Sequence, residues 1–535
     1  MRFFSASLLI VGCASVFAGC AQSPAAETGD DQNLIAGACK VSGEKLKRDL
    51  TAKEILALKD PVGALVIQSA GGCPTTLDEI TTKLRSTDTV NCKDDPKAPP
   101  AGGAVRFVSE RSQALKKPDS YRAVASRSCN SRGNHELLIS IFGVSATATK
   151  LPQDGIEMIG FDKTAGVFNF YAREDNKWKF FGSSKDLIGD GYNCDSAGAC
   201  VPKAASKVRC AGCHLGGGLI MKEFDSPWVH WEHLIDTPGA ADLATRFKMT
   251  VGGSKEDGAA MESTVRNGNS AWNDQRVAFL KTKTTADLLR PLFCTVDVNL
   301  QSMTSSSFSI PSSVRNDFLL EPRIGGFDSV PIDAADYTAV TTANGQAVKD
   351  QSGATLKDKD GKPVLDTVFA WTYPERGQND KDYVDKLVSK GVLDDDFVAD
   401  VLSIDMTRPV FSAKRCELLN SAPTLAAKDM TPAGIREGFK KALAGKTGAA
   451  AELLGFLNDT ADRQKHKDAA TKYLTACKAR PKKDFLADAL AYSGQLRTIA
   501  KSSLGLIEFS EAWAKDKFDG TADRRSFDLA TCTLK

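Results

Sequence analysis

The sequence of 535 residues predicts an α+β protein, with an antiparallel β-meander next to a mostly helical region and a largely helical C-terminal region. Three runs rich in aromatic and aliphatic residues, at 156–161, 167–172 and 178–182, follow one another with short polar turns between them, as in a meander. An apolar run at 136–144 predicts a buried strand before the meander. Towards the C-terminus, Ala and Leu recur at helical spacing.

Further elements are expected on both sides of this region. Thr51 and Glu54 have the spacing of a capping box at the start of a helix, and a second short helix is expected over 77–84. A stretch rich in Pro, Gly and Asp predicts a linker at 93–103. After a β-hairpin at about 350–372, helices are expected over 433–443, 449–457 and 484–499.

The first twenty residues resemble the signal of a bacterial lipoprotein. Arg2 is the only charge in the first nineteen residues, and the apolar stretch after it is too short to span a membrane. The stretch ends in an apolar residue, two small residues and Cys20, as in the lipobox of bacterial lipoproteins. In that family the chain is cut before the Cys and the thiol is lipidated, so Cys20 is the expected lipid-attachment residue. The alternative is ordinary cleavage near Ala21.

This signal implies a location in the bacterial cell envelope, facing the periplasm. Ala21 rather than Asp follows the expected lipidated Cys, which by analogy with enteric bacteria favours the outer membrane. No later stretch has the length of a membrane span, so attachment is expected through the lipid. Lys and Arg number 69 against 67 Asp and Glu, a balance that does not indicate a nucleic-acid partner.

The cysteine count is compatible with an oxidising compartment. The chain has 14 Cys. Cys13 is expected to leave with the signal, and Cys20, Cys210 and Cys213 have other expected roles. The remaining ten allow five disulfides. Cys194–Cys200 is the local pair that the sequence predicts, and the alternative is that some of the ten are buried thiols.

The most specific motif is Cys210-Ala211-Gly212-Cys213-His214, a Cys-x-x-Cys-His sequence. This is the attachment sequence of a c-type haem, in which two thiols bond to the haem vinyl groups and the His binds the iron. Zinc sites and redox dithiols share Cys-x-x-Cys, but the adjacent His favours haem. The sequence therefore predicts one covalent haem c, held by Cys210 and Cys213, with His214 as the axial ligand of the iron. Gly216 to Gly218 follow, where the backbone is expected to pass close to the porphyrin.

Several residues are candidates for the sixth ligand of the iron, which distinguishes carrier from catalyst. Met221 lies seven residues after His214, and His230 and His233 share one face of an expected helix that starts at 225–228. An open sixth position is the remaining alternative. The more distant methionine candidates are Met249, Met261, Met303 and Met406.

Charged residues near the motif have weaker expected roles. Arg209 and Lys222 are candidates to pair with the haem propionates, or else are surface residues. No catalytic residue is assigned, because the nearby carboxylates are expected mainly to cap and solvate a helix. These carboxylates are Glu223, Asp225, Glu232 and Asp236.

The segment from Val208 through the haem motif to Glu232, including Met221-Lys222-Glu223 and Ser226-Pro227-Trp228-Val229-His230-Trp231-Glu232, resembles a group of cytochrome c-like lipoproteins predicted in myxobacteria and related bacteria. The resemblance covers roughly 104–300, including the meander at 156–182. It implies haem c, electron transfer and an envelope location. It implies no substrate.

The combined expectation is an envelope lipoprotein with one haem c that acts in electron transfer with redox partner proteins. A haem enzyme of peroxidase or oxygenase type is the first alternative, because the chain is far longer than a small cytochrome needs. A structural or sensory haem lipoprotein is the second. The expected parts are a signal peptide at 1–19, a flexible tether at 20–33, a small Cys-containing segment at 34–103, a haem c-binding region at 104–345 and a mainly helical region at 346–535.

Overall fold

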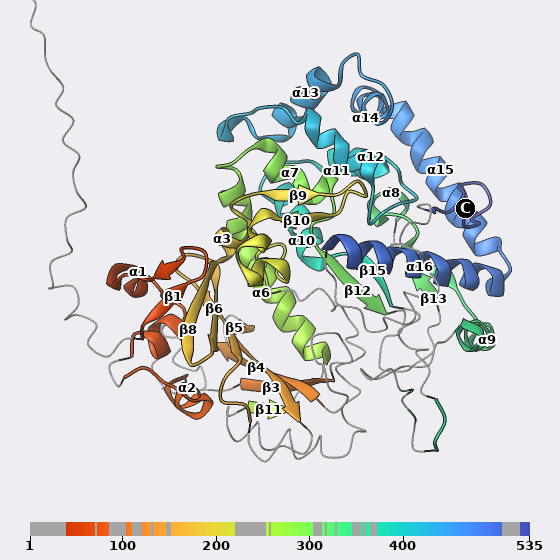
Figure 1. Ribbon diagram of the computed structural model, residues 1–535. Coiled ribbons are helices and arrows are strands. Elements are labelled where there is room, and N and C mark those ends of the chain that lie inside the picture. Colours follow the sequence, from red (N-terminus) through yellow and green to blue (C-terminus); the bar gives the residue numbers. More distant parts are fainter. Residues whose placement is uncertain are drawn as a thin grey trace, which may run out of the picture.

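The computed structural model of the chain describes the parts that position the expected site. The described residues are 39–69, 72–84, 103–109, 120–129, 133–145, 151–219, 253–255, 258–302, 313–315, 318–326, 329–344, 355, 357, 360–363, 372–504 and 525–535. The α+β expectation is confirmed, because an antiparallel-rich sheet packs against many helices (Figure 1).

Nine strands among the described residues form one sheet in the order β11-β3-β4-β5-β6-β7-β8-β1-β2. Strands β3 to β8 are antiparallel neighbours, whereas β1 pairs with β8 and β11 pairs with β3 in parallel. The strands are β1 (Val41–Gly43), β2 (Arg48–Asp49), β3 (Gly103–Ser109), β4 (Ser120–Cys129), β5 (Gly133–Ser145), β6 (Ile156–Asp162), β7 (Val167–Glu174), β8 (Lys177–Ser183) and β11 (Gly253–Lys255).

The predicted strand and meander are confirmed as β5 to β8. The turn between β7 and β8 contains Asp175 and Asn176 at φ 52° and 58°, the two left-handed residues that a tight hairpin of this kind requires. In β5, Leu138 joins one hydrophobic core, while Leu137 and Ile139 join another on the opposite face. Burial on both faces explains why this strand is a continuous apolar run in the sequence.

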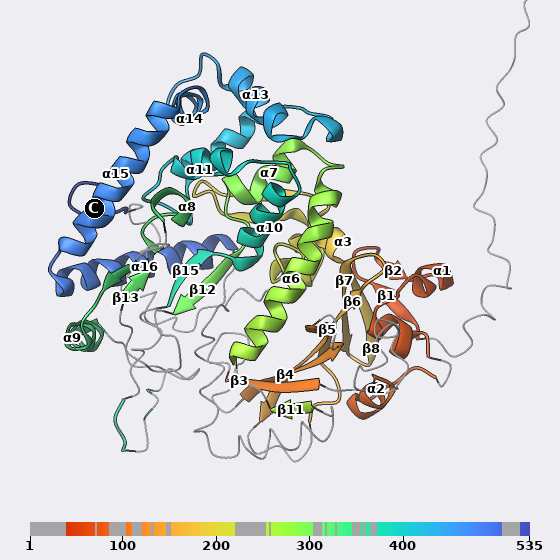
Figure 2. The ribbon, with the colours of Figure 1, turned by 180° about the vertical axis from the view of Figure 1, so that it is seen from behind.

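Helix α6 (Gly258–Leu280) covers one face of the sheet and separates it from the helical region (Figures 1 and 2). Phe168 and Phe170 of β7 lie in the same core as Trp272 and Val277 of α6. On the side facing away from the sheet, α6 packs against α10 (Gln378–Ser389). The helix is therefore in contact with both halves of the molecule.

The N-terminal segment covers the other face of the sheet. Helices α1 (Ala52–Leu56) and α2 (Leu77–Leu84) confirm the two expected short helices, and the Thr51–Glu54 capping box is present. A π-helical turn, η2 (Gly63–Ile67), lies between them in sequence. Their buried apolar side chains share a core with the second face of β5 and β6.

Asp60 fastens this segment to the sheet. Its buried carboxylate accepts hydrogen bonds from the backbone amides of Val62 and Gly63, at 2.9 and 3.1 Å. It also accepts from the Asn169 amide at 2.7 Å and the Tyr171 hydroxyl at 2.5 Å, both on β7. Burial raises the pKa of Asp60, against the effect of these four donors.

The C-terminal region is mainly helical, as expected. The helices predicted over 433–443, 449–457 and 484–499 are confirmed as α13, α14 and α16. The larger helices after α6 are α7 (Thr285–Phe293), α9 (Ala334–Asn344), α10, α11 (Asp395–Ser403), α12 (Ala413–Glu417), α13 (Pro432–Leu443), α14 (Ala449–Asn458), α15 (Thr460–Ala479) and α16 (Lys482–Leu504). Two-stranded ladders β12 (Val298–Ser302)–β15 (Thr372–Arg376) and β13 (Ser313–Arg315)–β14 (Ser329–Pro331) complete the region. A third ladder, β9 (Tyr192–Cys194)–β10 (Cys200–Pro202), follows the meander in sequence.

Four disulfides join the described residues: Cys39–Cys73, Cys194–Cys200, Cys294–Cys416 and Cys477–Cys532. The predicted local pair is thus present. Within the part of the chain that the structure describes, no helix is long and apolar enough to cross a membrane. Of the expected linker at 93–103, residues 93–102 lie outside the described residues and Gly103 begins β3. The tether and Cys20 also lie outside the described residues.

Candidate functional site

The Cys-x-x-Cys-His motif forms a tight turn after the β9–β10 hairpin. β9 (Tyr192–Cys194) and β10 (Cys200–Pro202) lead through the 3-10 turn η3 (Lys203–Ser206) into η4 (Arg209–Gly212). The Cys210 carbonyl then accepts from the amides of Cys213 and His214, at 3.1 and 2.8 Å. In a 3-10 turn residues three apart lie on the same side, which brings Cys210 and Cys213 to one side of the turn, while the next residue, His214, is buried.

The ring of His214 is held in one orientation. Only 8% of the residue is exposed, and its Nδ1 lies 2.9 Å from the Gly218 carbonyl oxygen. A carbonyl only accepts, so Nδ1 carries the proton and Nε2 has the lone pair in the neutral ring. The Phe170 ring, on β7, packs with its centre 5.0 Å from that of His214. Metal-bound histidines are commonly fixed in this way, through the nitrogen that does not bind the metal.

The three glycines after the motif have no room for side chains. A Cβ on Gly216 would lie 2.3 Å from the Asn379 amide nitrogen, and one on Gly218 would lie 2.3 Å from the Asn269 carbonyl oxygen. Gly217 has φ +73°, and a Cβ there would lie 2.8 Å from the Ser184 carbonyl oxygen. The three glycines thus allow a close approach of neighbouring protein groups to the backbone.

Side chains from distant parts of the chain hold the loop after His214. Trp272 of α6 donates its indole N–H to the Gly216 carbonyl at 2.8 Å. Asn269, one turn earlier on α6, accepts from the Leu219 amide at 2.8 Å. The Tyr192 hydroxyl donates to the Leu215 carbonyl at 3.3 Å, and burial raises the pKa of Tyr192 to about 12, which keeps this donor protonated.

The packing of α10 on α6 places Asn379 beside this loop. Asn273 of α6 donates its amide to the Asn379 carbonyl at 2.9 Å. The buried Arg276 guanidinium lies 3.4 Å from the Asp380 carboxylate and 4.4 Å from the centre of the Tyr383 ring. The helices that support the loop are therefore fixed to each other by buried polar contacts.

The motif cysteines differ from the other described cysteines. Of the ten cysteines whose side chains are described, eight form disulfides, while Cys210 and Cys213 keep their thiols. Cys213 is exposed and Cys210 is partly buried. Burial, with a contribution from the Glu157 carboxylate, raises the pKa of the Cys210 thiol. Redox-active dithiols show the opposite shift, so the environment of Cys210 does not resemble theirs.

The structure gives Arg209 protein partners of its own. Its guanidinium lies 3.0 Å from the carboxylates of both Glu157 on β6 and Glu174 on β7. It also lies 5.2 Å from the centre of the Phe181 ring. These contacts attach the motif turn to the meander, a role that the sequence analysis did not assign to Arg209.

Most of the candidates for the sixth iron ligand belong to segments outside the described residues. Met221, His230, His233, Met249 and Met303 lie outside the described residues, together with Lys222 and the four carboxylates at 223, 225, 232 and 236. Met261 is in α6, but its side chain is not described. Met406 is buried in the main hydrophobic core.

A second group of sulfur atoms lies elsewhere. The Sγ atoms of Cys194, Cys200, Cys294 and Cys416 all lie within 4.8 Å of one another, as two adjacent disulfides. Among the described residues, these four cysteines are the group of three or more potential metal ligands whose ligand atoms lie close together. The donors of the Cys-x-x-Cys-His turn do not converge in this way, unlike those of a structural zinc site.

Sequence reasoning missed the residues that hold the loop: Phe170, Ser184, Tyr192, Asn269, Trp272 and Asn379. The run of three glycines indicated a close approach, but not the groups approached. Comparisons of the chain with protein-family models, with curated proteins and with solved structures found no match.

The packing around the loop predicts different effects for two glycine substitutions. Gly218→Ala should destabilise the protein by about 1–3 kcal/mol, because the new methyl group is forced against Asn269. Gly212→Ala is the matched control, since a Cβ there meets no atom within 4 Å, and its effect should stay within about 0.5 kcal/mol. Urea denaturation followed by circular dichroism measures both. Equal stability of the two variants would contradict this description of the loop.

Proposed function

We propose that this protein is an envelope lipoprotein that carries one covalently attached haem c and transfers single electrons to and from redox partner proteins. One observation carries the proposal. The two motif cysteines keep their thiols, whereas the other eight cysteines whose side chains are described form disulfides, and the adjacent His214 is held by the Gly218 carbonyl with its lone pair on Nε2. Two thiols and one oriented imidazole are the groups that haem c attachment needs.

The residues present fit the group. Cys210 and Cys213 would supply the two thioether bonds, and His214 would bind the iron through Nε2. The iron of such a group alternates between two oxidation states, which is the chemistry of a single-electron carrier. The protonated Nδ1 of His214 donates to Gly218, a hydrogen bond that strengthens the imidazole as a ligand.

Rigid support of His214 suits electron transfer. Phe170 packs against the ring, and the backbone from Leu215 to Leu219 is fixed by Tyr192, Asn269 and Trp272. A ligand held by surrounding structure needs little rearrangement when the charge on the iron changes. The same burial limits access of water to this side of the site.

Haem attachment is tested with the motif cysteines. The protein should retain haem in a denaturing gel after expression with a cytochrome c maturation system, because thioether bonds survive denaturation. The double variant Cys210→Ala, Cys213→Ala should lose all haem stain, and Gly212→Ala should keep it. Haem stain of normal strength in the double variant would refute covalent attachment through this motif.

The coordination of the oxidised iron distinguishes a carrier from a catalyst. A carrier should show a low-spin ferric spectrum, because a second side chain fills the sixth position. If Met221 is that ligand, as we propose, Met221→Ala should give a high-spin spectrum and lower the reduction potential, while His230→Ala and His233→Ala should leave the spectrum low-spin. A high-spin wild-type protein that reacts rapidly with peroxide would instead support the peroxidase- or oxygenase-like alternative.

The membrane anchor is a separate part of the proposal. Cys20 follows a short apolar segment and two small residues, which supports lipidation there. Cys20→Ser should leave the protein unprocessed or release it from the membrane fraction, as measured by fractionation and N-terminal mass spectrometry. A mature wild-type protein that begins at Ala21 without lipid would contradict the anchor.

A further inference from the structure

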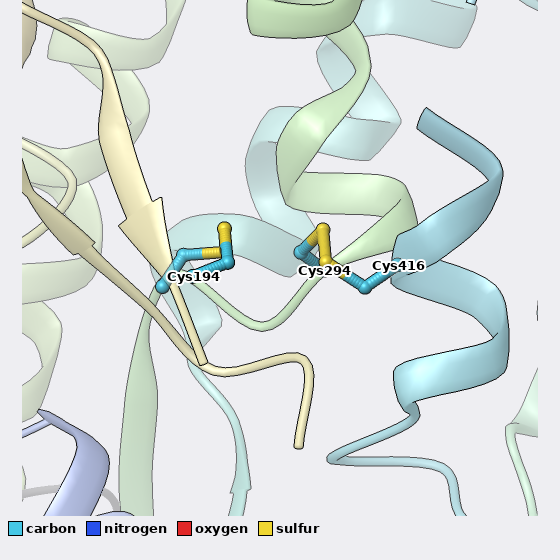
Figure 3. Close-up of side chains that lie close together, drawn as sticks. Cys194, Cys294 and Cys416 are labelled. Carbon is cyan, nitrogen blue, oxygen red and sulfur yellow. A yellow bond between two sulfur atoms is a disulfide. The ribbon is translucent and has the colours of Figure 1, made fainter. Parts of the chain in front are cut away.

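Two disulfides lie side by side at the junction of three segments (Figure 3). Cys194 and Cys200 face each other across the β9–β10 hairpin. Cys294, just after α7, is bonded to Cys416 of α12. All four Sγ atoms lie within 4.8 Å of one another, so a sulfur of one bond can reach the other with little movement of the backbone.

Backbone contacts keep the two disulfides together. The Cys200 amide donates to the Thr295 carbonyl at 2.8 Å, and the Thr295 amide donates to the Gly198 carbonyl at 2.9 Å. Gly198, at φ +90°, allows the hairpin tip to approach α12, since a Cβ there would lie 3.2 Å from the Cys416 Cβ. The β9–β10 hairpin therefore packs against both ends of the Cys294–Cys416 disulfide.

The four sulfurs differ in their access to solvent. Cys194 is exposed, Cys200 and Cys294 are buried, and Cys416 is intermediate. The Arg290 guanidinium lies 3.3 Å from the Cys194 Sγ. A positive charge at this distance stabilises a thiolate on Cys194, which is the usual environment of a reactive cysteine.

We propose that these two disulfides form a thiol–disulfide exchange site, in which a dithiol reductant attacks Cys194 and two electrons pass on to the less exposed Cys294–Cys416 bond. This activity is independent of the haem and goes beyond the proposed electron transfer.

The first step reduces the exposed disulfide. A thiolate of the dithiol bonds to Cys194 Sγ, the Cys194–Cys200 bond breaks, and Cys200 leaves as a thiolate. The second thiol of the reductant then displaces Cys194, so that the reductant departs as a disulfide. The Cys194 and Cys200 pair has gained two electrons and two protons, with the Cys194 thiolate beside Arg290 before it is protonated.

The second step moves the electrons inward. The Cys200 thiolate attacks Cys294, and the Cys294–Cys416 bond breaks with Cys416 as the leaving group. Cys194 then attacks Cys200 and displaces Cys294. The Cys194–Cys200 bond has formed again, and Cys294 and Cys416 end as thiols. The Cys294–Cys416 disulfide is thus reduced although the reductant attacks only the exposed Cys194.

The test uses the full-length mature protein and reduced dithiothreitol as the dithiol. Samples are quenched with acid over time, alkylated and mapped by mass spectrometry. Cys477–Cys532 is the internal control, because both residues are fully buried and belong to a separate part of the fold. Cys194 and Cys200 should become alkylated at least about tenfold faster than this control pair.

Three variants test the transfer. In the double variant Cys194→Ser/Cys200→Ser, reduction of the Cys294–Cys416 disulfide should slow by about tenfold or more. The Cys477–Cys532 control pair should keep its wild-type reduction rate, which shows that the fold is intact. In Cys194→Ser, the remaining Cys200 should form a linkage to Cys294 or Cys416. Arg290→Gln should lower the alkylation rate of reduced Cys194 several-fold near neutral pH.

Three results would overturn the proposal. One is reduction of Cys294–Cys416 at the wild-type rate in the double variant. Another is the absence of any linkage from Cys200 to the second pair in Cys194→Ser. The third is protection of all four reduced thiols from alkylation by added Zn²⁺, with no exchange between the pairs, which would assign the cluster to metal binding.

Discussion

The loop after His214 depends on three consecutive residues that have no side chain. Gly216 and Gly218 leave space for the amides of Asn379 and Asn269, and Gly217 adopts a left-handed backbone against Ser184. A Cβ at any of the three would meet another atom at less than 3 Å. Because the Gly218 carbonyl accepts from the His214 ring, the orientation of the imidazole depends on this packing.

The same loop connects the two halves of the molecule. Phe170 contacts His214 from the meander, Trp272 holds the loop from α6, and Asn379 lies beside it on α10. Residues from three separate parts of the sequence therefore determine one ring position. The sheet, α6 and the helical region therefore all contribute to the position of this ring. The hairpin that leads into the motif carries the Cys194–Cys200 disulfide, and the Cys294–Cys416 disulfide lies beside it.

The sequence predicted those parts of the fold that depend on residues close together in the chain. The meander, the Thr51 capping box and the Cys194–Cys200 pair each depend on residues a few positions apart. The parallel pairing of β1 with β8 joins distant segments, and nothing in either segment specifies the partner. The buried residues of α15 have helical spacing but lie only in its second half, at 470, 473, 474 and 477, and the first half of the helix is polar and has no such pattern. For the site, the motif identified the thiols and the imidazole, but Asn269 and Trp272 became recognisable only when α6 was seen against the loop.

The central claim is that Cys210 and Cys213 hold a haem through two thioether bonds beside an oriented His214. Trypsin cuts after Arg209 and Lys222, so one peptide, 210–222, contains both thiols, His214 and the three glycines. Mass spectrometry of this peptide from the mature protein tests the claim most directly. We predict a mass increased by one haem, with both cysteines resistant to alkylation after reduction. A peptide without haem, in which both cysteines are alkylated after reduction, would contradict the claim.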